Sequence, residues 1–579
     1  MRVAAVSAAR DPASVDRPKL PTGALPDPES PMADAFDTLT VPASATNLLG
    51  PADHRSLLTA VGRARLSGVL SARRQTPILE RTAQGSAKSE IAQARWPLLV
   101  VLAVQTALSV RLVPSNTAFQ DEALYLRTGR LEWAHWLHGA PIPDFPSYFS
   151  GAPVIYPPLG ALADSVGGLV AARLLSLCFM LGVTSMLWAT TGRLYGQRAA
   201  LLAAALFATL AGTQFLGAFA TFDSMALLLL ALATWTGVRS AECEFRSRVI
   251  LLITAGVALA SADAVKYATA LFTPVVLVVV TLAFWRRHRV GEGLAAGLVV
   301  LCSWGLLVMA AIAAGGRAYW LGVTTSTLDR AQSDAEVTVV LQRSYIWTSL
   351  ILVLAFLGAV LAIRGETRGR FLPAVLAFTA LLAPTEQARL HTTVSLQKHV
   401  VFGAWFAAIA AGYAMARLSR VDPGRGWAAV MALPIAASTL FGSMGQAAAL
   451  YKVWPNSAGV VSALRSAIHA HPGNYLAEDY DVEAYYLSDV PWQQWSSTYH
   501  FRYPGKPAGA PSFEAAINNH YFSMVMLNFG DTADTDRAIT ADMRRAGGYY
   551  VLIRAGRFTV WASRQSESVP QSGGEHADN

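Results

Sequence analysis

The chain has 579 residues, of which 53% are hydrophobic and only 15% are charged, and its formal net charge is +8. A soluble globular chain carries about 25% charged residues, and the apolar residues here lie in long blocks, so a soluble multidomain enzyme, a disordered chain and a fibrous chain are excluded. The composition predicts a polytopic α-helical membrane protein. The three cysteines lie outside the long polar segments, which excludes a disulfide framework and a cysteine-bound metal.

Residues 1–94 are rich in Ala, Pro, Ser, Asp and Arg and have no sustained apolar period. They are predicted to form a mostly disordered cytoplasmic tail. No apolar block follows an early basic stretch, so the tail does not have the pattern of a secretory signal peptide. The alternative for 54–74 is a basic helix on the inner leaflet, because Leu and Val recur there among arginines.

Residues 95–446 contain about eleven blocks that approach the roughly 20 mostly apolar residues needed for a membrane span. The blocks centre on 97–113, 168–190, 199–217, 219–238, 249–264, 268–285, 293–314, 346–363, 371–386, 399–416 and 427–446. They are predicted to form the transmembrane module of the protein.

Arginines cluster in the short loops that follow every second block, at 193–198, 239–248, 286–289, 364–370 and 417–425. Cytoplasmic loops carry an excess of Lys and Arg, so these loops are predicted to lie inside. The long segments 114–167, 315–345, 387–398 and 447–579 then lie on the opposite side. This alternation predicts a cytoplasmic N-terminus, an extracytoplasmic C-terminus and an odd number of spans, and it assigns the positive charge to membrane orientation and not to a nucleic-acid partner.

Residues 447–579 are polar and aromatic, and helix-like stretches alternate there with short strand-like runs. The helix-like stretches are 457–470, 512–520 and 534–546, and the strand-like runs are Tyr475–Ala477, Met524–Leu527, Tyr549–Ile553 and Phe558–Ala562. The last two runs are joined by Arg554-Ala555-Gly556-Arg557, which predicts a hairpin turn. The segment is therefore predicted to be a small extracytoplasmic α/β domain, large enough to fold alone.

The predicted outer loop 114–167 carries two adjacent carboxylates, Asp121 and Glu122, shortly after the first span. Two carboxylates at the depth of a lipid headgroup can serve as a base and as a hydrogen-bond acceptor for a sugar. An ordinary acidic loop is the alternative. The same loop contains Trp133 and His135, which suit either an aromatic belt at the interface or stacking on a sugar.

Cationic side chains lie near the same outer face on several spans. Arg173 lies one turn inside the second span, where it suits either phosphate binding or snorkelling to the surface. Lys266 follows the fifth span, and Lys398-His399 opens the tenth, as a phosphate site or as a solvated turn. Asp223 begins the fourth span as a helix cap or a functional group. Because these carboxylates and cations share one depth, they predict a single site at the outer membrane face.

Several short motifs occur in a fixed order against this topology. They are Asp121-Glu122-Ala123-Leu124-Tyr125, Tyr156-Pro157-Pro158-Leu159, Ala172-Arg173-Leu174-Leu175-Ser176, Tyr195-Gly196-Gln197-Arg198-Ala199-Ala200, Asp223 and Lys266-Tyr267. In order and spacing they resemble the GT-C superfamily of membrane glycosyltransferases, in the protein O-mannosyltransferase-like branch that includes the lipid A aminoarabinose transferases. The resemblance covers about 95–450.

The resemblance implies a polyprenyl-phosphate sugar as donor and a site on the outer face. It implies that Asp121 deprotonates the acceptor hydroxyl, that the anomeric carbon is inverted, and that Glu122 orients the acceptor or the sugar. Arg173, Lys266 and Lys398 are then expected at the donor phosphate. Further contacts to the acceptor or the sugar are expected from Tyr125, Trp133, His135, Tyr156, Asp223 and His399. Some relatives bind a divalent metal near the first loop and others need none, so a metal stays open.

The sequence therefore predicts a multi-pass glycosyltransferase of the cell membrane that transfers a hexosyl or pentosyl unit to an envelope lipid, glycan or protein. Polyprenyl phosphate is a tolerable leaving group, so such an enzyme needs only to hold the phosphate and remove one proton. The chain has no Walker-type phosphate loop, and the bilayer would deliver the donor. Two alternatives remain: a transporter or flippase of a lipid-linked sugar, against which the scarcity of charge in the middle of the spans argues, and a non-catalytic scaffold that binds envelope polymers.

Overall fold

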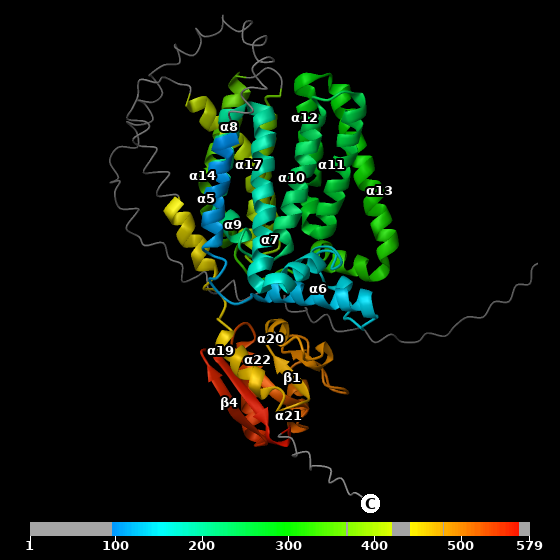
Figure 1. The fold of residues 1–579 in the computed structure, drawn as a ribbon, viewed down its shortest axis with the longest axis vertical. Helices are drawn as coiled ribbons and strands as arrows, with labels where there is room; N and C mark the ends of the chain where they lie inside the picture. Colours follow the sequence, from blue (N-terminus) through cyan, green and yellow to red (C-terminus); the bar gives the residue numbers. More distant parts are fainter. Residues whose placement is uncertain (1–94, 366–368, 420–439, 479, 567–579) are drawn as a thin grey trace, which may run out of the picture.

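The computed structural model describes residues 95–365, 369–419, 440–478 and 480–566. The predicted tail 1–94 lies outside the described residues, as does most of the predicted eleventh span, 427–446. The described residues form an α-helical bundle and a smaller domain built on a β-sheet. Figure 1 shows the two stacked end to end, with the sheet domain beyond one end of the bundle.

The bundle is built from the apolar blocks of the sequence. Seven of the described helices are long and apolar enough to cross a membrane. They are α7 (Tyr156–Tyr195), α10 (Phe222–Ser240), α11 (Phe245–Val265), α12 (Thr273–Arg287) with the preceding 3-10 helix η4 (Tyr267–Phe272), α13 (Val290–Val323) with the following π-helix η5 (Thr324–Leu328), α14 (Val337–Gly365) and α17 (Leu396–Leu418). Two shorter apolar helices, α5 (Arg95–Val110) and α8 (Gln197–Ala208), accompany them.

Two of the predicted spans are divided into short helices. The block 199–217 forms α8 and α9 (Ala211–Leu216), which are separated at Leu210, where the backbone is extended. The block 371–386 forms α15 (Leu372–Phe378), η6 (Thr379–Leu381) and α16 (Leu382–Arg389). Pro373 and Pro384 lie in the first turns of α15 and α16, where the missing N–H of proline interrupts a continuous helix. The count of eleven spans and the sidedness of the chain therefore stay predictions.

The predicted outer loop contains a helix, α6 (Gln120–His138), which lies across the end of the bundle in Figure 1. The next helix, α7, begins with two prolines in its first turn and is kinked at Gly167–Gly168, where Gly168 has a φ of 63°. The part of α7 before the kink runs along α6, and the two approach so closely that a Cβ on Gly129 would lie 1.9 Å from the Pro157 carbonyl oxygen. The part after the kink crosses the bundle.

The C-terminal domain has a five-stranded mixed sheet in the order β2-β1-β3-β5-β4. The strands are β1 (Asn474–Ala477), β2 (Trp495–Ser497), β3 (Phe522–Leu527), β4 (Tyr549–Ala555) and β5 (Phe558–Ser563), and the helices are α19 (Ala458–Ala467), α20 (Tyr480–Tyr486), α21 (Ala510–Asn518) and α22 (Ala533–Ala546). Strand β1 is parallel to both of its neighbours, and β5 is antiparallel to both of its own. Four strands overlap the runs expected from the sequence, whereas β2 and α20 are too short to give a pattern.

Helix α20 joins the C-terminal domain to α6. Arg127 of α6 forms a buried ion pair with Asp481 of α20. Arg130 of α6 donates to the backbone oxygen of Tyr485 at 2.9 Å, and the Ala118 N–H donates to the Tyr486 hydroxyl at 2.9 Å. The domain therefore helps to set the position of α6 and of the carboxylates at its start.

Candidate active site

The two adjacent carboxylates lie in the first turn of α6 and point in different directions. Phe119 is the N-cap, and the Glu122 side chain accepts a hydrogen bond from the Phe119 N–H at 3.1 Å. This is the return bond of a capping box, which fixes how the chain enters the helix. Successive helical residues are separated by about 100° around the axis. The side chain of Glu122 therefore points into the protein interior, whereas that of Asp121 faces a pocket.

Glu122 is completely buried and is held by an equally buried arginine. Its two oxygens accept hydrogen bonds from Arg173 Nε at 2.8 Å and Arg173 Nη2 at 2.6 Å, and the Ala220 N–H donates to it at 2.8 Å. The remaining Arg173 donors reach the backbone oxygens of Val113 and Asn116, at 2.6 and 2.9 Å, and that of Thr117 at 3.2 Å. This bidentate pair joins the start of α6 to α7 and to the segment that follows α5.

Asp121 lines a pocket of about 380 Å³ together with several cations. The titratable side chains of the pocket other than Tyr125 are those of Asp121, Lys266, Arg330, Lys398 and His399. The hydroxyl-bearing residues are Tyr125, Ser150, Ser326, Thr327 and Ser395. One carboxylate and three cations give the pocket a net positive charge, and hydroxyls offer further donors to an oxyanion.

Both lysines of the pocket are paired with carboxylates. Lys398 Nζ lies 2.7 Å from Asp121 Oδ2, and Lys266 Nζ lies 2.6 Å from Asp223 Oδ1. Asp223 is completely buried and also accepts a hydrogen bond from the Thr221 hydroxyl at 2.9 Å. Because Asp223 does not line the pocket, it acts on the pocket through Lys266. Asp121, in contrast, reaches the pocket directly, and its side chain is 22% exposed.

Each lysine of the pocket lies where one helix ends or another begins. Lys266 lies between α11 and η4 in an extended conformation, so the chain turns there before it re-enters the bundle. Lys398 lies in the first turn of α17, which begins directly after Ser395, whose φ of 55° is in the left-handed region. His399 Nδ1 lies 2.5 Å from the Gln387 amide nitrogen, which orients its ring.

Aromatic rings form the wall of the pocket beside Asp121. The ring of Tyr125 packs on Phe222 at 4.6 Å and on Phe149 at 5.6 Å, and the buried ring of Tyr156 meets it edge-on at 6.4 Å. Tyr125 and Phe222 line the pocket, whereas Tyr156 lies behind them. Lys266 Nζ lies 5.1 Å from the centre of the Phe222 ring, a cation–π contact that further fixes the lysine.

Part of the sequence matches a known family model, and the fold is similar to those of solved structures. Residues 161–313 match the family model described as dolichyl-phosphate-mannose-protein mannosyltransferase. The structure is similar to that of ArnT from Cupriavidus metallidurans bound to undecaprenyl phosphate, with a TM-score of 0.57 and 16% identity over 82% of this chain and 99% of that chain. It is also similar to the archaeal oligosaccharyltransferase AglB from Archaeoglobus fulgidus in complex with an inhibitory peptide and a dolichol-phosphate, with a TM-score of 0.52 and 13% identity over 83% of this chain and 75% of that chain.

The chain has the GT-C fold. This confirms the resemblance to GT-C membrane glycosyltransferases predicted from the sequence motifs, and the seven helices long and apolar enough to cross a membrane support a membrane location. No curated protein matches the sequence.

In this GT-C fold, the residues singled out in the sequence separate into three groups. Asp121, Tyr125, Lys266, Lys398 and His399 meet in one pocket. Glu122, Arg173, Asp223 and Tyr156 lie in the packed layer behind it. Trp133 and His135 lie about 12 residues further along α6, or roughly 18 Å at 1.5 Å per residue, and bond locally to the backbone oxygens of Pro158 and Ala140.

Sequence reasoning missed one cation of the pocket, Arg330. It follows η5, in the predicted outer segment 315–345, and it lines the pocket with Ser326 and Thr327. The available signal was its position, because basic residues are scarce in outer loops compared with cytoplasmic ones. Arg317 and Arg343 lie in the same predicted outer segment, so position alone did not single out Arg330.

The described residues do not suit a divalent metal at this site. No group of three or more His, Cys, Asp or Glu side chains in the described ranges is arranged to hold a metal ion. The pocket itself offers Asp121 as its one carboxylate, already paired with Lys398, among three cations. Divalent cations prefer several oxygen ligands, and the surplus of cations in this pocket disfavours a further positive charge.

Proposed function

We propose that this protein is an inverting glycosyltransferase that moves a sugar from a polyprenyl-phosphate donor to a cell-envelope lipid, glycan or protein at the outer face of the membrane. The observation that carries the proposal is the pocket itself. It places the partly exposed carboxylate of Asp121 among Lys266, Arg330 and Lys398 at one end of an apolar helical bundle. A base and an anion site are the two functions that such a reaction needs.

The donor phosphate is proposed to bind between the cations of this pocket. Lys398 and Lys266 stem from buried positions with carboxylate partners, so they are held in place before the donor arrives. Positioned cations stabilise the negative charge that grows on a departing phosphate without having to reorganise during the reaction. The apolar helices beside the pocket would keep the prenyl chain in the bilayer.

Asp121 is proposed to act as the general base. The acceptor hydroxyl attacks the anomeric carbon, the bond from that carbon to the phosphate oxygen breaks, and the hydroxyl proton passes to Asp121. The electron pair of the broken bond stays on the polyprenyl phosphate, where the cations hold it. Attack opposite to the leaving group inverts the anomeric carbon. General base catalysis of this kind contributes about 10²–10⁴-fold.

Glu122 and Arg173 are proposed to be positioning residues. They carry opposite charges, are almost fully buried, and do not line the pocket. Their bonds to backbone atoms on both sides of the α6 N-terminus hold the turn that presents Asp121. Asp223 has the corresponding role for Lys266.

The phosphate site is tested by binding of undecaprenyl phosphate to the purified protein in nanodiscs. Lys398→Met keeps the length of the side chain and removes its charge. It is expected to weaken binding by at least about tenfold, since hydrogen bonds to charged groups contribute about 1.5–3 kcal/mol. Lys506→Met, in an exposed loop of the C-terminal domain, is the matched control and is expected to bind like the parent.

Transfer itself is tested with polyprenyl-phosphate donors that carry labelled mannose or arabinose, supplied to the same nanodiscs with envelope extract as acceptor. Label that becomes attached to the extract supports the proposal. Label that crosses the bilayer without leaving the prenyl phosphate would support a flippase. Donor binding with neither transfer nor transport of the label would support the non-catalytic scaffold. Equal affinity of parent and Lys398→Met would remove this pocket from the donor site.

A further inference from the structure

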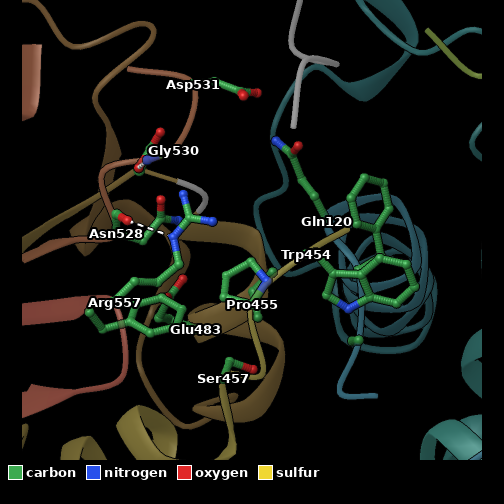
Figure 2. A pocket seen from close by; sticks show the side chains of 14 residues that line it. Gln120, Trp454, Pro455, Ser457, Glu483, Asn528, Gly530, Asp531 and Arg557 are labelled. Atoms are coloured by element: carbon green, nitrogen blue, oxygen red, sulfur yellow. Dashed lines mark hydrogen bonds between the residues drawn. The ribbon is translucent and has the colours of Figure 1, made fainter. Parts of the chain in front are cut away.

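A second pocket, of about 490 Å³, lies between the bundle and the C-terminal domain. We call it the interdomain pocket. Ala118, Phe119, Gln120, Trp454, Pro455 and Ser457 line it on the bundle side, and residues of α20, of the loop after β3 and of the β4–β5 turn line it on the other. Figure 2 shows Gln120 and Trp454 on one side of the space and Asn528, Gly530 and Arg557 on the other.

The interdomain pocket lies where the topology of the sheet favours a ligand. Strand β1 pairs in parallel with β2 on one side and with β3 on the other. The chain leaves β1 toward β2 and then returns to β3 on the opposite side, so the strand order reverses at β1. In open parallel sheets, ligands bind outside the carboxyl ends of the strands at this reversal. Glu478 and Asn528 follow the carboxyl ends of β1 and β3, and both line the pocket.

Two buried oxygens of this pocket have no hydrogen-bond donor in the part of the chain that the structure describes. They are Glu483 Oε2 and Asn528 Oδ1, on residues that are 3% and 8% exposed. Glu478, in contrast, accepts from the Gly530 N–H at 3.0 Å and the Thr532 N–H at 2.8 Å. Buried polar atoms are nearly always paired, so two unpaired oxygens in one pocket indicate a ligand that forms hydrogen bonds with them.

The side chains that line the interdomain pocket indicate which kind of ligand it can bind. The Arg557 guanidinium is held in the pocket by its bonds to the backbone oxygens of Asn528, at 2.9 Å, and Phe529, at 3.2 Å, and it opposes a cationic ligand. Burial raises the pKa of Glu483 to about 8, so this group is largely a neutral acid at neutral pH. A neutral acid, two amides and a guanidinium suit hydroxyls, which donate and accept alike. Trp454, packed on Phe119 at 5.1 Å, adds a flat apolar wall.

We infer that the interdomain pocket binds a saccharide, as the acceptor of the proposed transfer reaction. The claim that this saccharide is the acceptor rests on the proposed function, whereas the claim that a saccharide binds here does not. Gln120 lines the interdomain pocket and Asp121 lines the cationic pocket. These consecutive residues open α6, so the two pockets adjoin the same helical turn.

Binding is tested with the full-length protein in nanodiscs and four linear trisaccharides, built from mannose, arabinose, glucose or N-acetylglucosamine. We expect at least one of them to bind with a Kd below about 10 mM. Asn528→Ala removes an unpaired acceptor and is expected to weaken that binding by about fivefold or more. The matched control is Asn519→Ala, on an exposed residue at the end of α21, and it is expected to bind like the parent.

A second variant, Gly530→Ala, fills the pocket. A Cβ at Gly530 would lie 2.7 Å from Asn528 Oδ1 and 3.0 Å from Glu478 Oε1. Loss of saccharide binding in this variant, with the thermal unfolding temperature of the parent, supports the site even where Asn528→Ala folds poorly.

The inference is overturned if none of the four trisaccharides binds the parent below about 10 mM, or if Asn528→Ala and Gly530→Ala both bind like it. Saccharide binding without any sugar transfer from a prenyl-phosphate donor would instead overturn the proposed function and leave the saccharide site standing.

Discussion

The buried pair of Glu122 and Arg173 gives a prediction that separates positioning from catalysis. Glu122→Gln keeps the shape of the side chain but removes the charge, and one of its oxygens becomes an NH₂ group that faces donors only. All four hydrogen bonds to this carboxylate come from donors, two of them on an arginine that is 1% exposed. Breaking a buried pair by removing one partner costs about 3–5 kcal/mol, because the other charge stays buried without compensation.

The expected loss is measurable as a shift of the thermal unfolding temperature in detergent. At roughly 2 °C per kcal/mol for large domains, Glu122→Gln is expected to unfold about 5–10 °C below the parent. Glu386→Gln is the matched control. It removes the same charge from an ion pair with Arg389 in which both side chains are largely exposed, and such pairs contribute about 0–1 kcal/mol.

Activity must fall together with stability if Glu122 acts through the fold. A Glu122→Gln protein that unfolds at the temperature of the parent and yet transfers no sugar would refute the positioning role. Glu122 would then belong to the reaction itself. A variant that matches the parent in both measurements would show that the pair does not hold α6 in place.

Three further expectations follow from other contacts. Lys266→Met leaves Asp223 buried without its cation, so it should lower the unfolding temperature as well as the affinity for undecaprenyl phosphate, and a loss of neither would contradict its place in the site. Arg127→Leu leaves Asp481 unpaired where the C-terminal domain contacts α6, so limited proteolysis should release that domain faster than from the parent, and an unchanged rate would show that other contacts hold it. The pKa of Glu483 is raised by burial from 4.5 to about 8, so the folded state binds this proton more tightly than the unfolded state does. The resulting stabilisation is complete below the lower value and is lost as the pH rises through about 8, so the unfolding temperature should fall between about pH 5 and 9, and Glu483→Gln should reduce that fall.

Much of the fold could be predicted because its signals are local. Long apolar blocks gave the positions of α10, α11, α13, α14 and α17, and the strand-like runs gave β1, β3, β4 and β5. The helix α6 was not predicted, because its sequence is neither apolar nor strongly periodic and the helix is held by contacts with α7 and α20. Short elements such as β2 exist because neighbouring strands pair with them.

The site was predictable to a lesser extent, because its contacts join distant parts of the sequence. Asp121 and Lys398 are 277 residues apart, and Arg173 and Glu122 are 51 apart. From its residue type alone, Arg173 was a good candidate for a phosphate ligand. The structure shows that its donors are directed to Glu122 and to backbone oxygens. The predicted shared depth placed Asp121, Lys266 and Lys398 in one group, and all three line one pocket, but depth does not distinguish the pocket from the packed layer behind it.

Sugar transfer by Asp121→Asn is the most direct test of the central claim. The substitution keeps the size of the side chain and removes the base, and the 22% exposed side chain makes a folded variant expected. Transfer from a labelled polyprenyl-phosphate donor should fall by about 10²-fold or more, while undecaprenyl phosphate still binds and the unfolding temperature stays near that of the parent. Full transfer activity in Asp121→Asn would contradict the account, because the pocket contains no other carboxylate among the described residues.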